Sequence, residues 1–490
     1  MRFKIVAKYI GVSMLLVSAF MLISAVISAY NGFDAGFLPL LFSGIIAGAL
    51  GLFPSLFVRN AGRVRREEGF YVVTGSWFFC SLIGMVPFLM YGGPFTFTDA
   101  LFESVSGFTT TGASILSDIE SLPRSILFWR MSTSWIGGIG IIALFSLVLP
   151  SSGGSGSTLA EAEMSQIAKS ATQLKMKSFA RATVLTYVVL TIAAVFSLKF
   201  SGMCWFDAVT HAMSACATCG FSTKNASIAF YDNPLIEAVL AVFMVLCSIR
   251  FVLLVRAFTR QGARAFFGSE VVRVFLMSLF VSIVVITAGL AFSGDNGSLL
   301  HCFRLAAFQV ASVFTTTGLA TTDTALWPTM CISVLMAGSL VCGCSGSTSG
   351  GIKIERAIVG FKSIRQKVTQ MKSQNLVTRI SLDGKTVSEA AARETLLFIV
   401  CYIILIISGA VLLSVTGMDL ESSWTASLAC ISNVGPGFGE VGSMSNYSEL
   451  PGLAKYVCMA LMVIGRLEIF PVLYVFRLKS LRQAFQGKAL

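Results

Sequence analysis

Four short segments built around a glycine recur along this chain, and each one ends a short apolar stretch. The spacing between successive glycines leaves room for two membrane spans and a loop, so the pattern indicates one structural unit that is used four times. We call these segments the glycine segments. They are Thr109-Thr110-Thr111-Gly112-Ala113, Ala217-Thr218-Cys219-Gly220-Phe221, Thr315-Thr316-Thr317-Gly318-Leu319 and Asn433-Val434-Gly435-Pro436-Gly437.

The glycines allow a backbone that other residues adopt only with strain. Because glycine lacks a Cβ, it reaches positive φ at little steric cost. Alternating it with ordinary residues turns several consecutive carbonyls toward one axis, and four such strands would form a ring of oxygens that replaces the water around a cation. Threonine hydroxyls of the first and third segments would add ligands or brace the strands. Since Pro436 stiffens only the fourth segment, we expect an asymmetric ring that discriminates coarsely among monovalent cations.

The composition predicts a membrane protein before any motif is used. Hydrophobic residues make up 55% of the chain and charged residues only 12%, which excludes an ordinary soluble domain. Apolar runs near residues 9–28 and 37–57 are long enough to cross a hydrocarbon core of about 30 Å. The first run is too long for the core of a signal peptide, and a second span follows closely, so we expect a retained helix.

After residue 59 the pattern becomes span, re-entrant segment, span, four times over. The re-entrant stretches, Thr98–Phe108, Phe206–Cys216, Phe303–Phe314 and Ser422–Ile431, are too short to cross a bilayer. The expected outer spans lie near 70–91 and 126–150, 182–200 and 234–256, 271–293 and 327–360, and 394–415 and 452–476. With the two N-terminal spans, these make ten membrane-crossing helices.

The predicted fold is therefore an all-α polytopic membrane protein. Four repeats of helix, re-entrant pore half-helix with filter strand, and helix surround a pseudo-four-fold pore, and two extra transmembrane helices precede them. We expect the extra helices in residues 1–68 and the repeats in 69–180, 181–265, 266–385 (with a broken second helix) and 386–490.

The distribution of charge sets the expected orientation. Lysines and arginines gather in the loops on one side, which also holds both ends of the chain, so we expect that side to be cytoplasmic. The opposite side is rich in carboxylates, which predicts an acidic pore entrance that concentrates cations. This bias accounts for the net charge of +12 without nucleic acid as a partner.

A glycine- and serine-rich segment interrupts the second helix of the third repeat. We call it the glycine–serine loop. Four glycines here cannot hold a continuous helix, and the freed backbone groups must find partners or line water, so we expect a gate across the conduction path. A phosphate-binding loop is the rival interpretation, but residue 352 is isoleucine where lysine is required and no strand precedes the segment. The loop consists of Gly343, Cys344, Ser345, Gly346, Ser347, Thr348, Ser349, Gly350 and Gly351.

Arg466 lies in the middle of the last predicted span. A charge at this depth costs roughly 2.5–3.5 kcal/mol on insertion scales, so it must face a partner or a water-filled path. One interpretation places the guanidinium below the filter, where it raises the barrier to cations and contributes to gating. The other makes it a structural arginine bonded to helix ends or to the broken helix. For Arg130 and Arg250 we favour a structural role.

Two further patterns suggest chemistry that the rest of the sequence does not support. Cys216 and Cys219 have redox spacing and would serve a membrane thiol oxidoreductase, but the other cysteines are mostly scattered through apolar spans, where cysteine acts as a small hydrophobe. His211 and His301 fall in different half-helices, so neither a histidine metal site nor a catalytic pair is expected. We expect no catalytic residues and no enzyme activity.

The glycine segments, the glycine–serine loop and Arg466 together resemble the TrkH/TrkG-type proteins of the Trk/Ktr/HKT cation transporter superfamily, over essentially the whole chain. The resemblance implies uptake of K⁺ (and Rb⁺) through a gated, channel-like pore in a bacterial inner membrane, with no bound cofactor besides the transported ion. An obligate H⁺ or Na⁺ symporter is the alternative, but it would need a buried carboxylate relay. The K⁺ ligands would come from Thr110, Thr111, Thr218, Cys219, Thr316, Thr317, Asn433 and Val434.

The resemblance also implies partners. It implies a homodimer in the lipid bilayer and a cytosolic nucleotide-binding regulatory ring of the RCK/KTN, TrkA-like type that opens or closes the pore. Glycine at all four filter positions resembles the potassium-selective members of the superfamily. The basic stretches 59–66 and 360–385 would provide the docking face for the ring.

Overall fold

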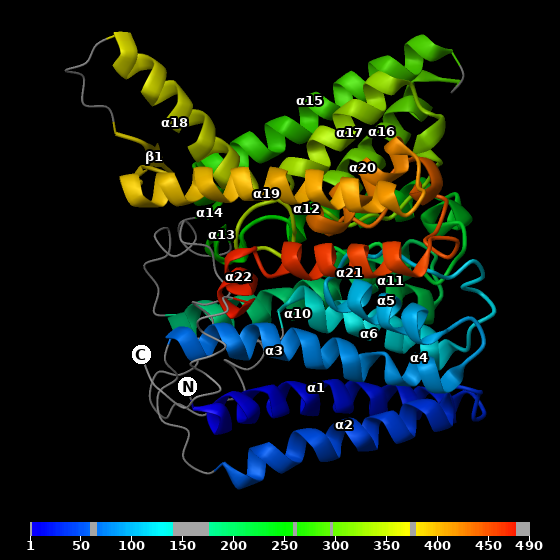
Figure 1. The fold of residues 1–490 in the computed structure, drawn as a ribbon. Coiled ribbons are helices and arrows are strands. Elements are labelled where there is room, and N and C mark those ends of the chain that lie inside the picture. The colour runs from blue at the N-terminus through cyan, green and yellow to red at the C-terminus, as the bar shows by residue number, and fades with distance from the viewer. Residues whose placement is uncertain are drawn as a thin grey trace.

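The computed structural model describes residues 2–58, 66–140, 176–257, 262–294, 297–372 and 379–476. Within these ranges the chain is almost entirely helical, as the sequence predicts. Helices α1 (Phe3–Tyr30) and α2 (Phe37–Phe57) form an antiparallel pair at one edge of the molecule (Figure 1). A Cβ at Gly11 would lie 2.7 Å from the carbonyl oxygen of Gly51. This pair packs closely because small residues bring the two backbones together.

The remaining helices fall into four groups in chain order, each with a long first helix, a short helix and a second helix. The first group is α3 (Arg66–Gly84) with α4 (Val86–Tyr91), then α5 (Phe97–Phe108) and α6 (Arg124–Gly138). The second is α10 (Met176–Phe200), α11 (Trp205–Ala217), and α12 (Pro234–Cys247) with α13 (Phe251–Ala257). The third is α14 (Gly262–Phe267), α15 (Glu270–Ser293), α16 (Leu299–Phe314), α17 (Thr329–Val341) and α18 (Ile354–Lys372). The fourth is α19 (Glu389–Val415), α20 (Leu420–Ser432), and α21 (Gly452–Arg466) with α22 (Phe470–Phe476).

Few other elements interrupt the described helices. A small antiparallel hairpin of β1 (Ser381–Leu382) and β2 (Lys385–Thr386) joins the third group to the fourth. Single 3₁₀ turns, Ser227–Tyr231, Thr324–Leu326 and Gly439–Val441, follow three of the glycine segments. In Figure 1 most long helices run roughly parallel. Helices α15 and α17 are inclined to them at the upper right, and α18 projects from the molecule at the upper left.

The described part of the chain contains six helices long and apolar enough to cross a membrane, or seven if the bent pair α12 and α13 counts as one span. The sequence predicts ten spans. The difference arises because α6, α12, α17 and α21 are only 13 to 15 residues long. A helix of that length covers about 20 Å, less than the hydrocarbon core. The last part of the span expected at 126–150 lies outside the described residues.

Breaks in the second helices are more general than the sequence predicts. A break was expected only in the third group, at the glycine–serine loop. The second group is also broken, with an angle of 105° between α12 and α13, and α21 ends at Arg466, before α22 begins. All these second helices therefore stop after a similar length, close to the ends of the short helices.

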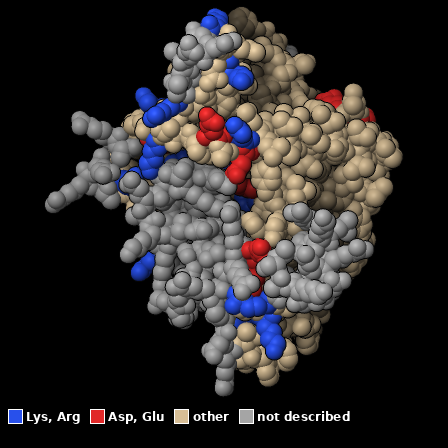
Figure 2. Space-filling model, turned by 60° about the vertical axis from the view of Figure 1, so that its left-hand side comes forward, with Lys and Arg blue, Asp and Glu red and all other residues tan. Residues whose placement is uncertain are grey.

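The end of the molecule that carries Arg2 and α22 is rich in basic side chains. Figure 2 shows groups of Lys and Arg on the described part of this face, with Asp and Glu among them and also at the upper right. Several of the carboxylates at this end are paired, as in Arg2–Glu68 at 2.7 Å and Lys362–Glu270 at 2.5 Å.

Candidate ion pathway

The four glycine segments meet in a closed ring. A Cβ at Gly112 would lie 2.7 Å from the Cα of Gly220, and one at Gly220 would lie 2.9 Å from the carbonyl oxygen of Gly318. A Cβ at Gly318 would strike Pro436 Cδ at 2.8 Å, and one at Gly435 would lie 3.1 Å from the carbonyl carbon of Gly112. Each segment thus touches the next through backbone. Glycine is required at these positions because no side chain fits between the strands.

A shared backbone turn precedes each ring glycine. Thr110, Thr218, Thr316 and Asn433 all have positive φ, between 53° and 60°. Such a conformation costs a residue with a side chain about 1–2 kcal/mol, and its persistence indicates that the surroundings enforce it. In each segment the following amide returns to the short helix at 2.8–3.0 Å, the acceptors being the carbonyls of Ser106, Ser214, Ser312 and Ala429.

Hydroxyl groups brace the segments from behind. Thr109 and Thr111 share a hydrogen bond of 2.8 Å, and Thr315 and Thr317 share one of 2.7 Å. The sequence leaves two roles open for these threonines, as ion ligands or as supports of the strand. These hydrogen bonds within the segment are those of a support. Serines of the short helices add to it by donating to the segment carbonyls, Ser106 to Ala113 at 2.5 Å and Ser312 to Leu319 at 2.6 Å, with Ser214 bonded to Cys219.

The fourth segment is held differently. Ala429 occupies the position of the bracing serines and carries no hydroxyl. Instead, the hydroxyl of Tyr447 donates to the carbonyl of Gly435 at 2.7 Å, and the side-chain amide of Asn433 donates to the hydroxyl of Thr111 at 3.0 Å. The expected asymmetry of the ring is therefore present in its hydrogen bonding.

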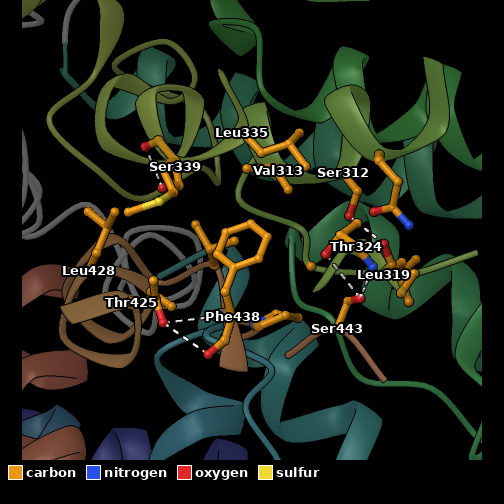
Figure 3. A pocket seen from close by; sticks show the side chains of 18 residues that line it. Ser312, Val313, Leu319, Thr324, Leu335, Ser339, Thr425, Leu428, Phe438 and Ser443 are labelled. Carbon is orange, nitrogen blue, oxygen red and sulfur yellow. Dashed lines mark hydrogen bonds between the residues drawn. The ribbon is translucent and has the colours of Figure 1, made fainter. Parts of the chain in front are cut away.

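A small cavity lies behind the third and fourth segments. Its volume is about 30 Å³, enough for one water molecule. Figure 3 shows side chains from α16, α17 and α20 converging on it, with Phe438 at its centre. Ser312 and Ala429 both line it, so the missing hydroxyl of Ala429 leaves part of this space unfilled.

A buried ion pair supports the first two segments. Arg130 and Glu103 are 2.5 Å apart, and their side chains are at most 1% exposed. Glu103 accepts hydrogen bonds from Ser114 and from the amide of Ile115, while Arg130 donates to the carbonyl of Ser222. The structural role expected for Arg130 is confirmed. The pair joins the residues that follow two adjacent segments.

A cup of about 180 Å³ opens on one side of the ring. Gly112, Gly220, Gly318 and Pro436 form part of its floor. Among the described residues that line it, the charged ones are Arg130 and Lys224, both basic.

The described lining of the cup therefore contains no carboxylate, but Asp118 and Glu120 both accept hydrogen bonds from Asn225, which lines it. Several carboxylates of that side are neutralised in ion pairs. Asp99 pairs with Lys455 at 2.7 Å, and Arg304 pairs with both Asp232 and Glu237. A carboxylate held beside a cation adds little to the field at the cup.

The glycine–serine loop packs on the opposite side of the ring. The amide of Gly350 donates to the hydroxyl of Thr316 at 3.0 Å, and the hydroxyl of Thr348 lies 3.2 Å from the carbonyl of Cys216, at the end of α11. A Cβ at Gly350 would strike the carbonyl of Ser432, at the end of α20. The loop thus touches the ends of three short helices or their segments.

Charged residues hold this loop at both ends. Glu355, which is fully buried, accepts from the amide of Ser345 at 2.8 Å and pairs with Arg250 at 2.8 Å, which confirms a structural role for Arg250. After the loop, Lys353 and Arg356 both reach Glu468 at 2.5 Å. These contacts join the breaks in the second, third and fourth groups.

Arg466 lies between the loop and the first group. Its guanidinium donates to the carbonyl of Thr348 at 2.7 Å and to those of Gly137 and Gly138 at 2.7 and 3.0 Å. These are the helix end and the broken helix named in the structural interpretation of this arginine. The same bonds fix a positive charge against the loop.

This chain is similar in sequence to known proteins over nearly its whole length. The family model described as cation transport protein, TrkH, matches residues 43–487. The chain belongs to the TrkH family. The Trk system potassium uptake protein TrkH of Escherichia coli K12 is 32% identical over 480 residues, which cover 97% of this chain and 99% of that protein. The Trk system potassium uptake protein TrkG of the same organism is 33% identical over 84% of this chain and 85% of its own length.

A solved structure has the same fold. The crystal structure of the potassium transporter TrkH from Vibrio parahaemolyticus superposes with a TM-score of 0.88 and 28% identity, over 98% of this chain and 99% of that one. As a TrkH-family member, the chain is a multi-pass membrane protein of a transporter family, which is not a family of enzymes.

The residues considered for thiol or histidine chemistry lie in or next to the second glycine segment, except His301. Cys216 and Cys219 are buried free thiols. The ring of His211 contacts the carbonyl of Asp207 and the hydroxyl of Ser222, at 2.8 and 3.0 Å. His301 lies in the first turn of α16, away from His211 in α11.

Sequence reasoning missed several supports of the ring. Glu103 belongs to the carboxylate-rich side, and its position in the middle of a half-helix, four residues after Asp99, is the signal that indicates burial. Lys224 is a base on that side, and no local pattern indicates that it lines the cup. The break between α12 and α13 has no local signal, because Ser248-Ile249-Arg250 contains neither glycine nor proline.

Proposed function

We propose that this protein takes up potassium ions across a bacterial inner membrane. The ions move through a pore whose narrow part is the ring of glycine segments. The ring is the single observation that carries the proposal, because backbone carbonyls arranged around an axis replace the hydration shell of a monovalent cation. The potassium uptake named for its relatives supports the choice of ion. Rb⁺, which is similar in size to K⁺, is expected to follow the same path.

The proposed ligands are the backbone carbonyl oxygens of the glycine segments. The carbonyl ends of the short helices add partial negative charge near the ring, which favours a dehydrated cation. Uptake needs no chemical energy source in this chain, since each 100 mV of membrane potential contributes about 2.3 kcal/mol per monovalent cation.

The proposed gate is the glycine–serine loop together with Arg466. The hydrogen bonds of Gly350 and Thr348 hold the loop against the short-helix ends, and Arg466 fixes it from below. Opening would require that these few bonds break together and the loop withdraw. The ion pairs of Glu468 and Glu355 lie just outside the loop and would serve as its hinges.

The proposed assembly is a homodimer with both termini in the cytoplasm. A cytosolic nucleotide-binding ring would control the gate by acting on the basic end of the molecule, where Arg365, Lys367 and Lys372 of α18 are exposed. Residues 360–372, within α18, belong to one of the two basic stretches proposed as the docking face. Most of the other stretch, 59–66, lies outside the described residues.

Ion uptake in cells tests this function directly. A bacterium that lacks its own potassium uptake systems would carry the wild type or Gly112→Ser, with the cognate regulatory protein, and be followed by growth at low K⁺ and by ⁸⁶Rb⁺ influx. We expect rescue by the wild type and a changed K⁺/Na⁺ preference in the variant. Absence of rescue by an expressed wild type would contradict the proposal.

The symport alternative makes a different prediction. An ion-coupled carrier would need a buried carboxylate that can exchange a proton or Na⁺, whereas the buried Glu103, Glu237 and Glu355 each pair with an arginine. We expect ⁸⁶Rb⁺ influx at a clamped membrane potential to be independent of the pH and Na⁺ gradients. A dependence on either gradient would favour symport.

A further inference from the structure

The cup outside the glycine ring contains an unusual charge for the entrance of a cation pathway. Lys224 follows the second glycine segment by three residues and lines the cup together with Gly112, Gly220 and Gly318. The backbone holds it there, because its amide donates to the hydroxyl of Ser222 at 3.1 Å. This bond fixes the backbone of Lys224, and the ammonium is placed by its contacts with Phe230 and Glu120.

Neighbouring groups hold the ammonium but do not cancel its charge. The nitrogen lies 4.2 Å from the centre of the Phe230 ring, a cation–π contact. The carboxylate of Glu120 is 3.9 Å away, and the two side chains are 22% and 40% exposed. An exposed pair at this distance is weak and is screened by salt.

The other base of the cup contributes much less charge. Arg130 is 2.5 Å from Glu103 in a fully buried pair, so the two charges largely cancel outside the protein. Among the described residues that line the cup, Lys224 is therefore the charged one without a buried counterion.

We propose that Lys224 limits cation entry: its ammonium lowers the local concentration of monovalent cations at the mouth of the ring and makes uptake depend on ionic strength. A fixed charge in a concave site with low-dielectric walls changes the local concentration of ions severalfold. Salt removes the effect, because the Debye length falls from about 30 Å at 0.01 M to about 3 Å at 1 M. Glu120 moderates the effect by standing beside the ammonium.

This inference rests on the proposed potassium uptake and specifies a residue that sets its rate at low salt. The test measures initial ⁸⁶Rb⁺ influx at limiting Rb⁺ in the potassium-uptake-deficient bacterium, with ionic strength set by choline chloride and osmolarity held constant with sorbitol. Lys224→Gln removes the charge, and Lys224→Arg keeps it. Lys199→Gln is the matched control, since Lys199 also makes a cation–π contact, with Trp205, but does not line the cup.

We expect Lys224→Gln to raise influx about two- to fivefold at about 0.01 M ionic strength and to equal the wild type at about 0.5 M. Lys224→Arg and Lys199→Gln should follow the wild type at both salt concentrations. Glu120→Gln should lower influx at low salt. Expression of each variant in the membrane is measured in parallel.

Each contrary result has a distinct meaning. Influx through Lys224→Gln that matches the wild type at low salt overturns the inference, and so does a gain that persists unchanged at high salt. Equal effects of Lys224→Gln and Lys224→Arg would also overturn it, because they would indicate a structural role for the side chain. If the expressed wild type itself carries no Rb⁺, the proposed potassium uptake fails instead.

Discussion

The guanidinium of Arg466 donates a 2.7 Å hydrogen bond to the carbonyl of Thr348, so the last long segment of the chain holds the middle of the glycine–serine loop. On its other side, the hydroxyl of Thr348 lies 3.1 Å from the carbonyl of Cys247 at the end of α12. One loop residue therefore joins the fourth group to the second. The same arginine reaches the carbonyls that end α6, which adds the first group to the connection.

Replacing Arg466 with alanine should release this connection. We expect ⁸⁶Rb⁺ influx to rise severalfold, because the variant removes three hydrogen bonds to the loop and to α6 together with a positive charge below the ring. Arg466→Lys separates the two causes, since lysine keeps the charge but cannot reproduce the planar set of donors. Influx of Arg466→Ala at or below the wild-type level, in protein that is correctly folded, would contradict the proposed gate.

Gly318 should not tolerate a side chain. A Cβ there would strike the carbonyl of Val434, and the residue has a φ of 81°, so Gly318→Ala combines a clash with backbone strain. Gly417 has a φ of 99° with nothing within 4 Å of a Cβ, so Gly417→Ala carries the strain alone. We expect uptake to be lost in the first variant and kept in the second. Equal activity of the two would mean that the ring is not closely packed.

Ala429→Ser should strengthen discrimination between K⁺ and Na⁺. The added hydroxyl would enter the cavity that Ala429 lines and would be placed to donate to the carbonyl of Pro436, seven residues on, as Ser106 does to Ala113. Ser106→Ala should have the opposite effect, because it removes that donor from the first segment. Competition of Na⁺ with ⁸⁶Rb⁺ influx measures both variants, and a shift in the same direction for both would refute the argument.

Glu103→Gln should destabilise the protein. Breaking a buried ion pair by removing one partner costs about 3–5 kcal/mol, and here Arg130 would remain buried at 1% exposure. Glu389→Gln serves as the control, since its pair with Arg393 lies on the surface. We expect the midpoint of thermal unfolding in detergent to fall clearly only for the first variant. An unchanged midpoint would show that Arg130 finds another partner.

Local features of the fold were predictable from the sequence. The half-helix expected at Thr98–Phe108 is α5, Phe97–Phe108, and the one expected at Ser422–Ile431 is α20, Leu420–Ser432. These helices are amphipathic, begin at a capping residue such as Thr96 or Asp419, and end where the chain must turn for the glycine segment. Each of these signals lies within a dozen residues.

The breaks in α12–α13 and α21–α22 were not predictable in the same way. Ile469 has a φ of 59°, a conformation that a β-branched residue avoids, and nothing next to it in the sequence suggests such a turn. The break is held by Glu468, whose partners Lys353 and Arg356 come from the third group. Likewise, Arg250 is held by Glu355. Contacts between different helix groups determine where these helices break. A sequence pattern within one segment carries no information about such contacts.

The four walls of the ring are encoded separately within one polypeptide. In a pore made of four identical subunits, a single substitution alters every wall at once. Here Ala429 and Pro436 could diverge from their counterparts while the other three walls stayed as they were. Evolution can therefore adjust the ion preference of such a pore one quarter at a time, through intermediates that still work.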